Sequence, residues 1–158
     1  MENKFQYSPI VICGFPGIGK SRVAHDRLSI SDSDSSEFSW MWDKENPMMR
    51  VRNPEFPQNY GARIEKFVTG FEYEYILVSS HQVVRDDLKY RGIRYIVVAP
   101  RRCLKSEYLA RYLKRGSTMD FIETLNEKWD EFIDGIENED APVIWLEAGQ
   151  YLSDVIGV

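Results

Sequence analysis

One eight-residue segment near the start of the chain constrains both its fold and its chemistry. Residues 14–21 read GFPGIGKS and match the phosphate-binding pattern G-x-x-x-x-G-K-[ST]. An apolar run at 10–13 precedes the segment and a short polar helix is expected after it, which is the order that phosphate binding requires. The glycines let backbone N–H groups converge on an anion, and the helix adds the positive end of its dipole. The segment therefore predicts binding of a nucleoside triphosphate.

The residue types of this loop have distinct expected roles. Lys20 brings a full positive charge to the β- and γ-phosphates, and Ser21 offers a hydroxyl to Mg²⁺. ATP and Mg²⁺ are therefore the expected cofactors, and Lys20 is also expected to act in catalysis. The residues expected to bind the nucleotide are Gly14, Gly17, Ile18, Gly19, Lys20, Ser21 and Arg22.

Length and composition indicate one domain, residues 1–158. A chain of 158 residues with 43% hydrophobic content fits a single domain with a full core. No apolar run approaches the roughly 18 residues of a membrane span, and the polar start does not resemble a secretion signal, so we expect a cytoplasmic protein without a membrane partner.

The cysteines and the net charge exclude two further features. Cys13 and Cys103 are expected to be reduced packing residues and not a disulfide bridge. A net charge of −5 disfavours non-specific attraction to nucleic acid, which is not an expected partner.

Short apolar runs alternate with helical patterns along the chain. Strands are expected at residues 8–13, 28–31, 73–78, 93–99 and 142–146. Helices are expected to begin near residues 57, 81, 104 and 117, the last of them with a capping box formed by Ser117 and Asp120. Such alternation predicts an α/β fold, in which helices cover both faces of a five-stranded parallel sheet.

Two acids, Asp32 and Asp34, follow the second expected strand, where ligands of open parallel sheets gather. Because they alternate on an extended segment, one can face the metal while the other faces the phosphate acceptor. A carboxylate beside an acceptor hydroxyl can orient it or take its proton. The alternative is a loop in which Asp and Ser side chains make local turns.

The phosphate loop and the element order resemble the small P-loop kinases of nucleosides, nucleotides and related metabolites. This group includes adenylate and shikimate kinases, and the chain is particularly similar to short kinase-like proteins of bacteriophages. Most of the chain shares the element order, but only residues 14–21 are a highly specific motif. The resemblance implies a three-layer P-loop NTPase fold with strand order 2-3-1-4-5. It also implies a substrate-covering segment at about 37–60, a lid at about 100–116, an adenine seat on the backbone near 148–150 and, for a phage protein, a location in the host cytoplasm.

The same resemblance assigns roles to the acids. In shikimate-kinase-like proteins an Asp-x-Asp at this place serves the Mg²⁺ neighbourhood and the substrate hydroxyl, which implies Asp32 for the metal, together with Ser21, and Asp34 for catalysis. The third expected strand ends in Ser79 and Ser80, whereas many P-loop proteins place a metal-binding acid there. This difference disfavours the large ATPase machines.

Arginines of the expected lid are candidates for catalysis, because phosphoryl transfer needs cations over the equatorial oxygens. Arg111 and Arg115 are four residues apart and share a helical face, while Arg101 and Arg102 stand at the hinge. We expect at least one of Arg111 and Arg115 to be catalytic. An exposed ion pair between Glu107 and Arg111 would explain the spacing equally well.

The acceptor is expected to be a small molecule with an aromatic ring and a phosphate. Aromatic faces are available on Phe38, Trp40, Trp42 and Tyr60, and basic groups on Arg50, Arg52, Arg63 and Arg85. A (deoxy)nucleoside monophosphate uses both features, and the expected substrate-binding residues are Asp32, Asp34, Arg63 and Arg85. A nucleoside or another small alcohol is the alternative, and the aromatic residues can instead be core under a long loop. A non-catalytic ATP-binding module or switch is the alternative of another class, although the GTPase motif N-K-x-D is absent.

Overall fold

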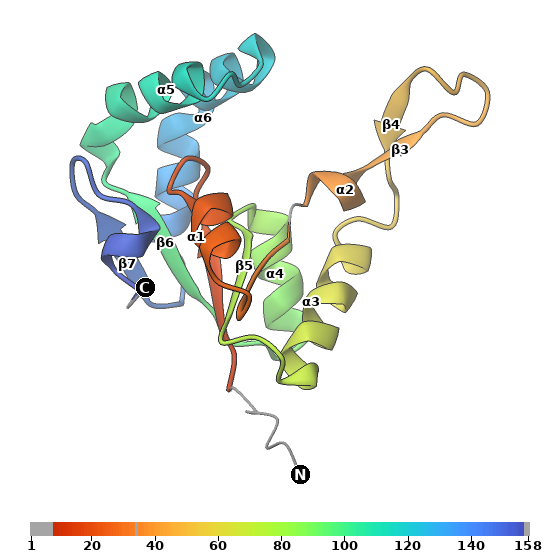
Figure 1. The fold of residues 1–158 in the computed structure, drawn as a ribbon. Helices are drawn as coiled ribbons and strands as arrows, with labels where there is room; N and C mark the ends of the chain where they lie inside the picture. Colours follow the sequence, from red (N-terminus) through yellow and green to blue (C-terminus); the bar gives the residue numbers. More distant parts are fainter. Residues whose placement is uncertain (1–7, 34, 157–158) are drawn as a thin grey trace.

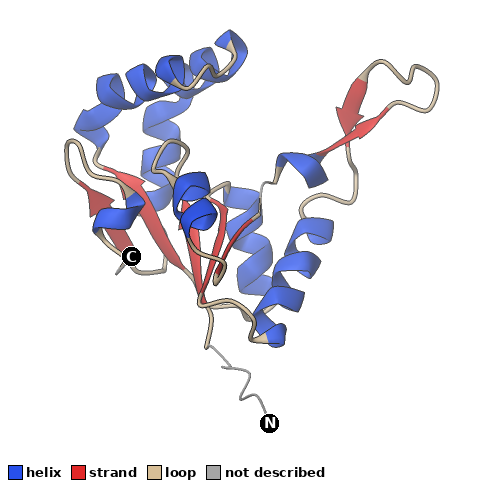
Figure 2. Ribbon diagram, in the orientation of Figure 1, coloured by secondary structure: helices blue, strands red, loops and turns tan. Residues whose placement is uncertain are grey.

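A computed structural model describes residues 8–33 and 35–156 of the chain. Its main sheet has five parallel strands in the order β2-β5-β1-β6-β7 (Figures 1 and 2). These strands are β1 (Ile10–Gly14), β2 (Ile30–Asp32), β5 (Tyr75–Ser79), β6 (Ile96–Pro100) and β7 (Val143–Leu146). Counted along the chain within this sheet, the order is 2-3-1-4-5, which confirms the predicted P-loop NTPase topology.

The central strands are apolar on both faces because helices cover both faces. In β1 the four residues after Ile10 are buried, and Ile76, Leu77 and Val78 of β5 are 0% exposed. The register places Ile12 beside Leu77 on one neighbouring strand and beside Ile96 on the other. All five carboxyl ends therefore meet at one edge of the sheet, where β1 runs into the phosphate loop.

The helices form the outer layers. They are α1 (Lys20–Asp26), α2 (Ser36–Ser39), α3 (Gln58–Gly70), α4 (Gln82–Tyr90), α5 (Lys105–Lys114) and α6 (Met119–Glu137), with 3₁₀ turns η1 (Arg102–Leu104) and η2 (Leu152–Asp154). In Figure 1, α1 lies in front of the sheet and α4 and α6 lie behind it. Helix α6 buries Ile122, Leu125, Trp129, Ile133 and Ile136, which repeat at helical spacing as the sequence predicted.

The start of α6 differs from the prediction of a Ser117–Asp120 capping box. Thr118 is the N-cap, and its side chain accepts a hydrogen bond from Phe121 N at 3.2 Å. Ser117 lies one residue too early, and its hydroxyl accepts a hydrogen bond from Arg115 Nε at 2.7 Å. The cap is still a hydroxyl side chain at the helix start, shifted by one residue.

A two-stranded antiparallel hairpin, β3 (Trp40–Trp42) and β4 (Arg50–Arg52), lies outside the main sheet. Figure 1 shows it projecting from the same end of the molecule as the phosphate loop, on the opposite side from α5. The sequence analysis had predicted no strand between residues 31 and 73, so the hairpin corrects that expectation. The α5–α6 pair and the hairpin thus flank the loop.

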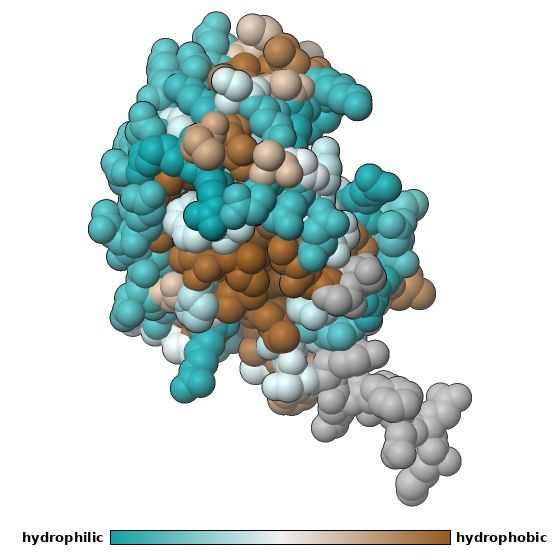
Figure 3. Space-filling model, turned by 90° about the vertical axis from the view of Figure 1, so that its left-hand side faces the viewer, coloured by the Kyte–Doolittle hydropathy of each residue, from teal (hydrophilic) through white to brown (hydrophobic). Residues whose placement is uncertain are grey.

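Strand β7 is an edge strand of the main sheet, at the side opposite β2. Figure 3 shows an apolar patch on the side of the molecule that faces left in Figure 1. In β7, Val143, Ile144 and Trp145 are half-buried. Of the two cysteines, Cys13 is buried as expected, but Cys103 is exposed, which corrects its prediction as a packing residue. Burial raises the pKa of the Cys13 thiol. No helix in the described part of the chain has the length and apolar character needed to cross a membrane.

Candidate functional site

The phosphate loop turns back sharply between β1 and α1. Gly17 and Gly19 have positive φ angles of 91° and 93°, a backbone conformation that residues with a side chain rarely adopt. Phe15 N donates to Val98 O at 3.0 Å, which ties the start of the loop to β6. Lys20 Nζ folds over the loop and donates to Gly14 O at 2.6 Å. The lysine is therefore positioned at the loop, where a phosphate would receive its charge.

Buried aromatic rings from α5 and α6 hold the outside of this loop. Phe15 is 1% exposed and packs edge-on against Trp129, with ring centroids 5.2 Å apart. Tyr112 donates from its hydroxyl to Pro16 O at 2.8 Å, and a Cβ atom added to Gly17 would lie only 2.9 Å from Tyr112 Cε1. The loop is thus fixed by close packing as well as by hydrogen bonds.

Arg111 joins the loop to α5 and to the segment after β7. Its guanidinium donates to Gly17 O and to Gln150 O, each at 2.9 Å. It also lies 3.9 Å from the ring centroid of Tyr151 and pairs with Glu107 at 3.2 Å. The side chain is only 11% exposed. Arg111 therefore lies at the site as predicted, but it is held by fixed contacts on several sides, and its catalytic role stays a prediction.

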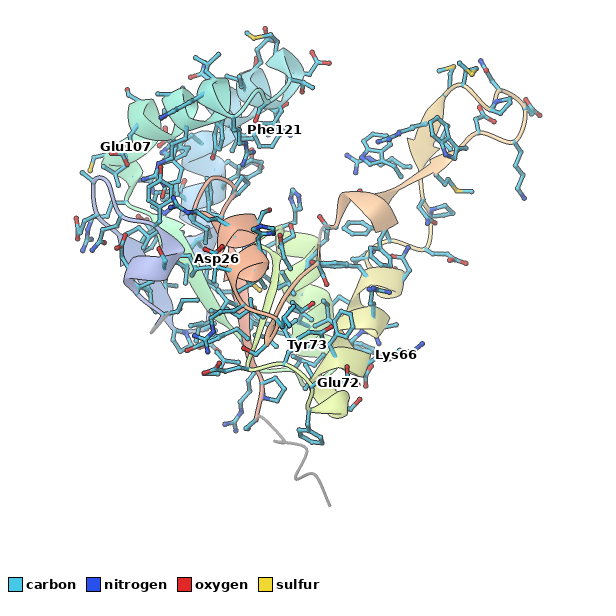
Figure 4. The ribbon with its side chains drawn as sticks, viewed as in Figure 1. Asp26, Lys66, Glu72, Tyr73, Glu107 and Phe121 are labelled. Carbon is cyan, nitrogen blue, oxygen red and sulfur yellow. The ribbon has the colours of Figure 1, made fainter. Side chains whose placement is uncertain are left out.

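Arg115 points to a different place. Its Nε donates to Ser117 Oγ, and its guanidinium carbon lies 4.9 Å from the Tyr112 ring and 5.2 Å from the Phe121 ring. In Figure 4, Phe121 lies toward the carboxyl end of α5, and Glu107, the partner of Arg111, lies toward its amino end. The two predicted lid arginines are thus one helical turn apart but belong to separate clusters.

Ser21 and Asp32 meet beside the loop. Ser21 Oγ donates to Asp32 Oδ2 at 2.9 Å, which joins the start of α1 to the end of β2. A hydroxyl and a carboxylate fit Mg²⁺, which usually takes one or two protein oxygens and completes its shell with water and substrate phosphates. Within residues 8–33 and 35–156, no group of three His, Cys, Asp or Glu side chains could hold a metal. Asp34, the other predicted acid, lies outside the described residues.

Tyr60 connects the ends of two strands. Its hydroxyl donates to Ser33 O at 2.6 Å and accepts from Ser79 N at 3.2 Å. The residue is 0% exposed. Its expected role as an aromatic face for a base is therefore corrected, because the ring is part of the core. A signal for this burial exists in the sequence, because Tyr60 and Ile64 are four residues apart and share the buried face of α3.

Arg85 is buried and faces the interior, between α4 and α6. Its side chain is 3% exposed and forms an ion pair with Glu139, while Nε donates to Ser80 O at 3.0 Å. Burial alone would raise the pKa of Glu139, but hydrogen bonds from Lys89 and Tyr95 and the charge of Arg85 hold it below its ordinary value. This geometry gives Arg85 a structural role and does not support its predicted contact with an acceptor phosphate.

Arg63 remains exposed, on α3. Its guanidinium carbon lies 5.0 Å from the Phe67 ring and 5.8 Å from the Phe38 ring. Phe38 is half-buried and packs against Tyr60. An aromatic ring and a guanidinium therefore lie together at the root of the hairpin, and the substrate-binding role of Arg63 stays a prediction.

The predicted adenine seat follows β7. Gly149 N donates to Glu107 Oε1 at 3.0 Å, and Leu152 N donates to Ile18 O at 2.8 Å. The segment is thus hydrogen-bonded both to α5 and to the phosphate loop. Its place beside the loop agrees with the expectation, while adenine binding itself stays a prediction. Sequence reasoning missed Glu107 as a link between these elements, because its spacing indicated only the pair with Arg111.

Comparisons with known proteins identify the fold. No family model matches the chain, and no curated protein matches its sequence. The structure of the tunicamycin resistance protein of Deinococcus radiodurans is 16% identical with a TM-score of 0.51, over 90% of this chain and 87% of the other. A gluconokinase from Sinorhizobium meliloti 1021 is 15% identical with a TM-score of 0.52, over 97% of this chain and 89% of the other. At these identities the likeness shows the fold alone, a P-loop fold with helices on both faces of a parallel sheet.

Proposed function

We propose that this protein is an ATP-dependent phosphotransferase of the P-loop kinase type. The observation that carries the proposal is the placement of Lys20, Ser21 and Asp32 around the phosphate loop at the carboxyl ends of the strands. Lys20 lies over the loop, and Ser21 contacts Asp32 at 2.9 Å. The similarity in fold to a gluconokinase supports the same class of chemistry. Mg²⁺, when bound by Ser21 and Asp32, would neutralise charge on the phosphate oxygens.

The proposed reaction moves the γ-phosphoryl group of ATP to an oxygen of the acceptor, which is a phosphate oxygen in a nucleoside monophosphate and a hydroxyl oxygen in a nucleoside or small alcohol. A bond forms between the acceptor oxygen and the γ-phosphorus, and the bond from that phosphorus to the β–γ bridging oxygen breaks, so ADP leaves. Lys20 would exchange its bond to Gly14 O for the phosphates, and with a hydroxyl acceptor Asp34 would take the proton that the hydroxyl loses. Arg111 or Arg115 would stabilise the charge of the transferred group.

For the acceptor we propose a (deoxy)nucleoside monophosphate. Its support is the pairing of exposed Arg63 with Phe38 at the root of the hairpin. The burial of Arg85 removes one of the two arginines expected to bind the acceptor phosphate. This favours the alternative, a nucleoside or other small alcohol, which needs no phosphate-binding arginine. Both acceptor classes therefore belong in the test.

The test measures ADP formation with a panel of ribo- and deoxynucleoside monophosphates, nucleosides and small polyols. We expect turnover that depends on the acceptor, abolished by Lys20→Ala and unaffected by Lys114→Ala, an exposed lysine of α5. Asp34→Asn should keep Mg·ATP binding in calorimetry and reduce transfer by about 100-fold, within the range of general-base effects. Binding of Mg·ATP with no acceptor-dependent ADP would instead support a non-catalytic module. Unchanged turnover in Asp34→Asn would contradict the role of that acid.

A further inference from the structure

The β3–β4 hairpin carries two exposed pairs of tryptophan and arginine. The antiparallel register places Trp40 opposite Arg52 and Trp42 opposite Arg50. The guanidinium carbons lie 4.4 Å and 5.4 Å from the respective ring centroids. Trp40 is 38% and Trp42 is 58% exposed. Since side chains alternate along a strand, all four lie on one face of the hairpin.

The hairpin is anchored at its root and accessible beyond it. Asn53 N donates to Ser39 O at 2.9 Å, and Asn59 Nδ2 donates to Phe38 O at 3.0 Å. In the described ranges, β3 and β4 pair only with each other, and the hairpin projects from the body (Figure 1). Met48 at the turn is 86% exposed. The Trp–Arg face is therefore held in one place and open to a ligand.

The chemistry of this face matches that of a nucleotide chain. A base can stack on an indole or on the outer side of a guanidinium plane, and the guanidinium can also bind a phosphate. Residues two apart on a strand are roughly 6.8 Å apart, twice the rise per residue. Stacked bases of a duplex repeat at about 3.4 Å per strand, so neighbouring bases of a duplex would not match the two pairs. An unstacked single strand can place one nucleotide on each pair.

The net charge of −5 opposes such binding only where the acidic surface is near. At about 0.1 M salt, charges are screened beyond about 10 Å, so the arginines of a projecting hairpin act largely by themselves. Arg50 and Arg52 lie on the face with the indoles, while Asp43, Lys44 and Glu45 lie in the turn that follows β3. The local charge of the Trp–Arg face is therefore positive, although the net charge of the whole chain is negative.

We propose that the Trp–Arg face of this hairpin is a binding site for single-stranded nucleic acid. Its two Trp–Arg pairs each take one nucleotide, with the base on the aromatic stack and the phosphate on the arginine. The proposal does not depend on phosphotransferase activity. A second copy of this chain is the other occupant that such a face could take, and the experiment separates the two.

The test follows the fluorescence anisotropy of a labelled oligothymidylate of about ten nucleotides, a length typical of single-strand sites. We expect Trp40→Ala with Trp42→Ala to weaken binding at least about tenfold, since stacking of each base contributes roughly a fivefold effect or more and two stacks are lost. The matched control is Tyr90→Ala on α4, an aromatic residue that is 91% exposed, and it should bind as the wild type does. Trp42→Phe keeps a ring and should retain most of the binding.

The arginines are tested by salt dependence. Arg50→Gln with Arg52→Gln should reduce the slope of log affinity against log salt by about 1.4, because each phosphate contact on a single strand contributes about 0.7. Arg94→Gln, an exposed arginine before β6, should leave the slope unchanged. Circular dichroism and Mg·ATP calorimetry on each variant show whether its fold is retained.

Four results would overturn the proposal. They are absence of wild-type binding to the oligothymidylate, equal binding of a duplex of the same length, wild-type affinity in the folded Trp40→Ala, Trp42→Ala variant, and a wild-type dimer in sedimentation that this variant dissociates. The last result would assign the face to a second copy. Lys20→Ala should bind the strand normally, so failure of the kinase proposal and failure of this one are distinguishable.

Discussion

The two structures that flank the phosphate loop use aromatic residues in opposite ways. On one side, Tyr108 and Tyr112 of α5 are 0% exposed and pack against the loop backbone. On the other side, Trp40 and Trp42 of the hairpin remain exposed beneath arginines. Burial therefore distinguishes rings that hold the loop in shape from rings that are available to a ligand. Substitutions in the α5 flank should therefore change stability and nucleotide binding. Substitutions in the hairpin flank should change binding of the single strand.

The largest effect is expected from Tyr112→Ala. Removing this buried ring leaves a cavity against Gly17 and Phe121 and should lower the free energy of unfolding by about 3–5 kcal/mol. Denaturant unfolding measures the change. Tyr112→Phe removes only the hydroxyl bonded to Pro16 O and should cost about 1 kcal/mol. Equal losses in the two variants would show that the hydrogen bond, and not the packing, braces the loop.

A smaller loss is expected from Gly17→Ala, about 2–3 kcal/mol in the same measurement, because the new methyl combines a positive φ of 91° with contact on Tyr112. Gly116→Ala is the matched control. Its φ is 82°, but among the described atoms nothing lies within 4 Å of the added Cβ, so it should cost only about 1 kcal/mol. If both variants lost the same free energy of unfolding, the contact between Gly17 and α5 would not contribute to the cost.

Arg111→Met and Arg115→Met test whether the two arginines of the α5 flank have different roles. Arg111 holds Gly17 O and Gln150 O, so its replacement should weaken Mg·ATP binding about tenfold in calorimetry. Arg115 contacts Ser117 and two rings, so its replacement should leave that affinity unchanged. If Arg111→Met reduced turnover at constant affinity, Arg111 would act on the transferred group and not through the loop.

The smallest effect on stability is expected from Trp42→Ala, below about 1 kcal/mol, because the ring is 58% exposed and loses mainly its cross-strand pair with Arg50. Thermal unfolding checks this value. A loss comparable to that of Tyr112→Ala would show that the hairpin is a structural part of the domain, and the contrast between the flanks would fail.

Local patterns predicted much of the main sheet. The loop motif, the apolar runs and the helical repeat of α6 correspond to observed elements, because each depends on residues close together in the chain. The hairpin was missed, although a signal exists. Trp40 to Trp42 and Arg50 to Arg52 alternate with period two around a turn-rich segment. Each strand has three residues, too few for such a pattern to stand out from an irregular loop.

Sequence by itself determined the phosphate loop and the succession of strands and helices, since backbone geometry at glycines and the spacing of apolar residues are local properties. Only the tertiary structure decided which polar and aromatic side chains face the site. Arg85 and Arg63 looked equivalent in the chain, yet one pairs with Glu139, 54 residues away, and the other is exposed. Ion pairs and ring contacts between distant segments depend on the packing of helices against the sheet, which no local spacing specifies.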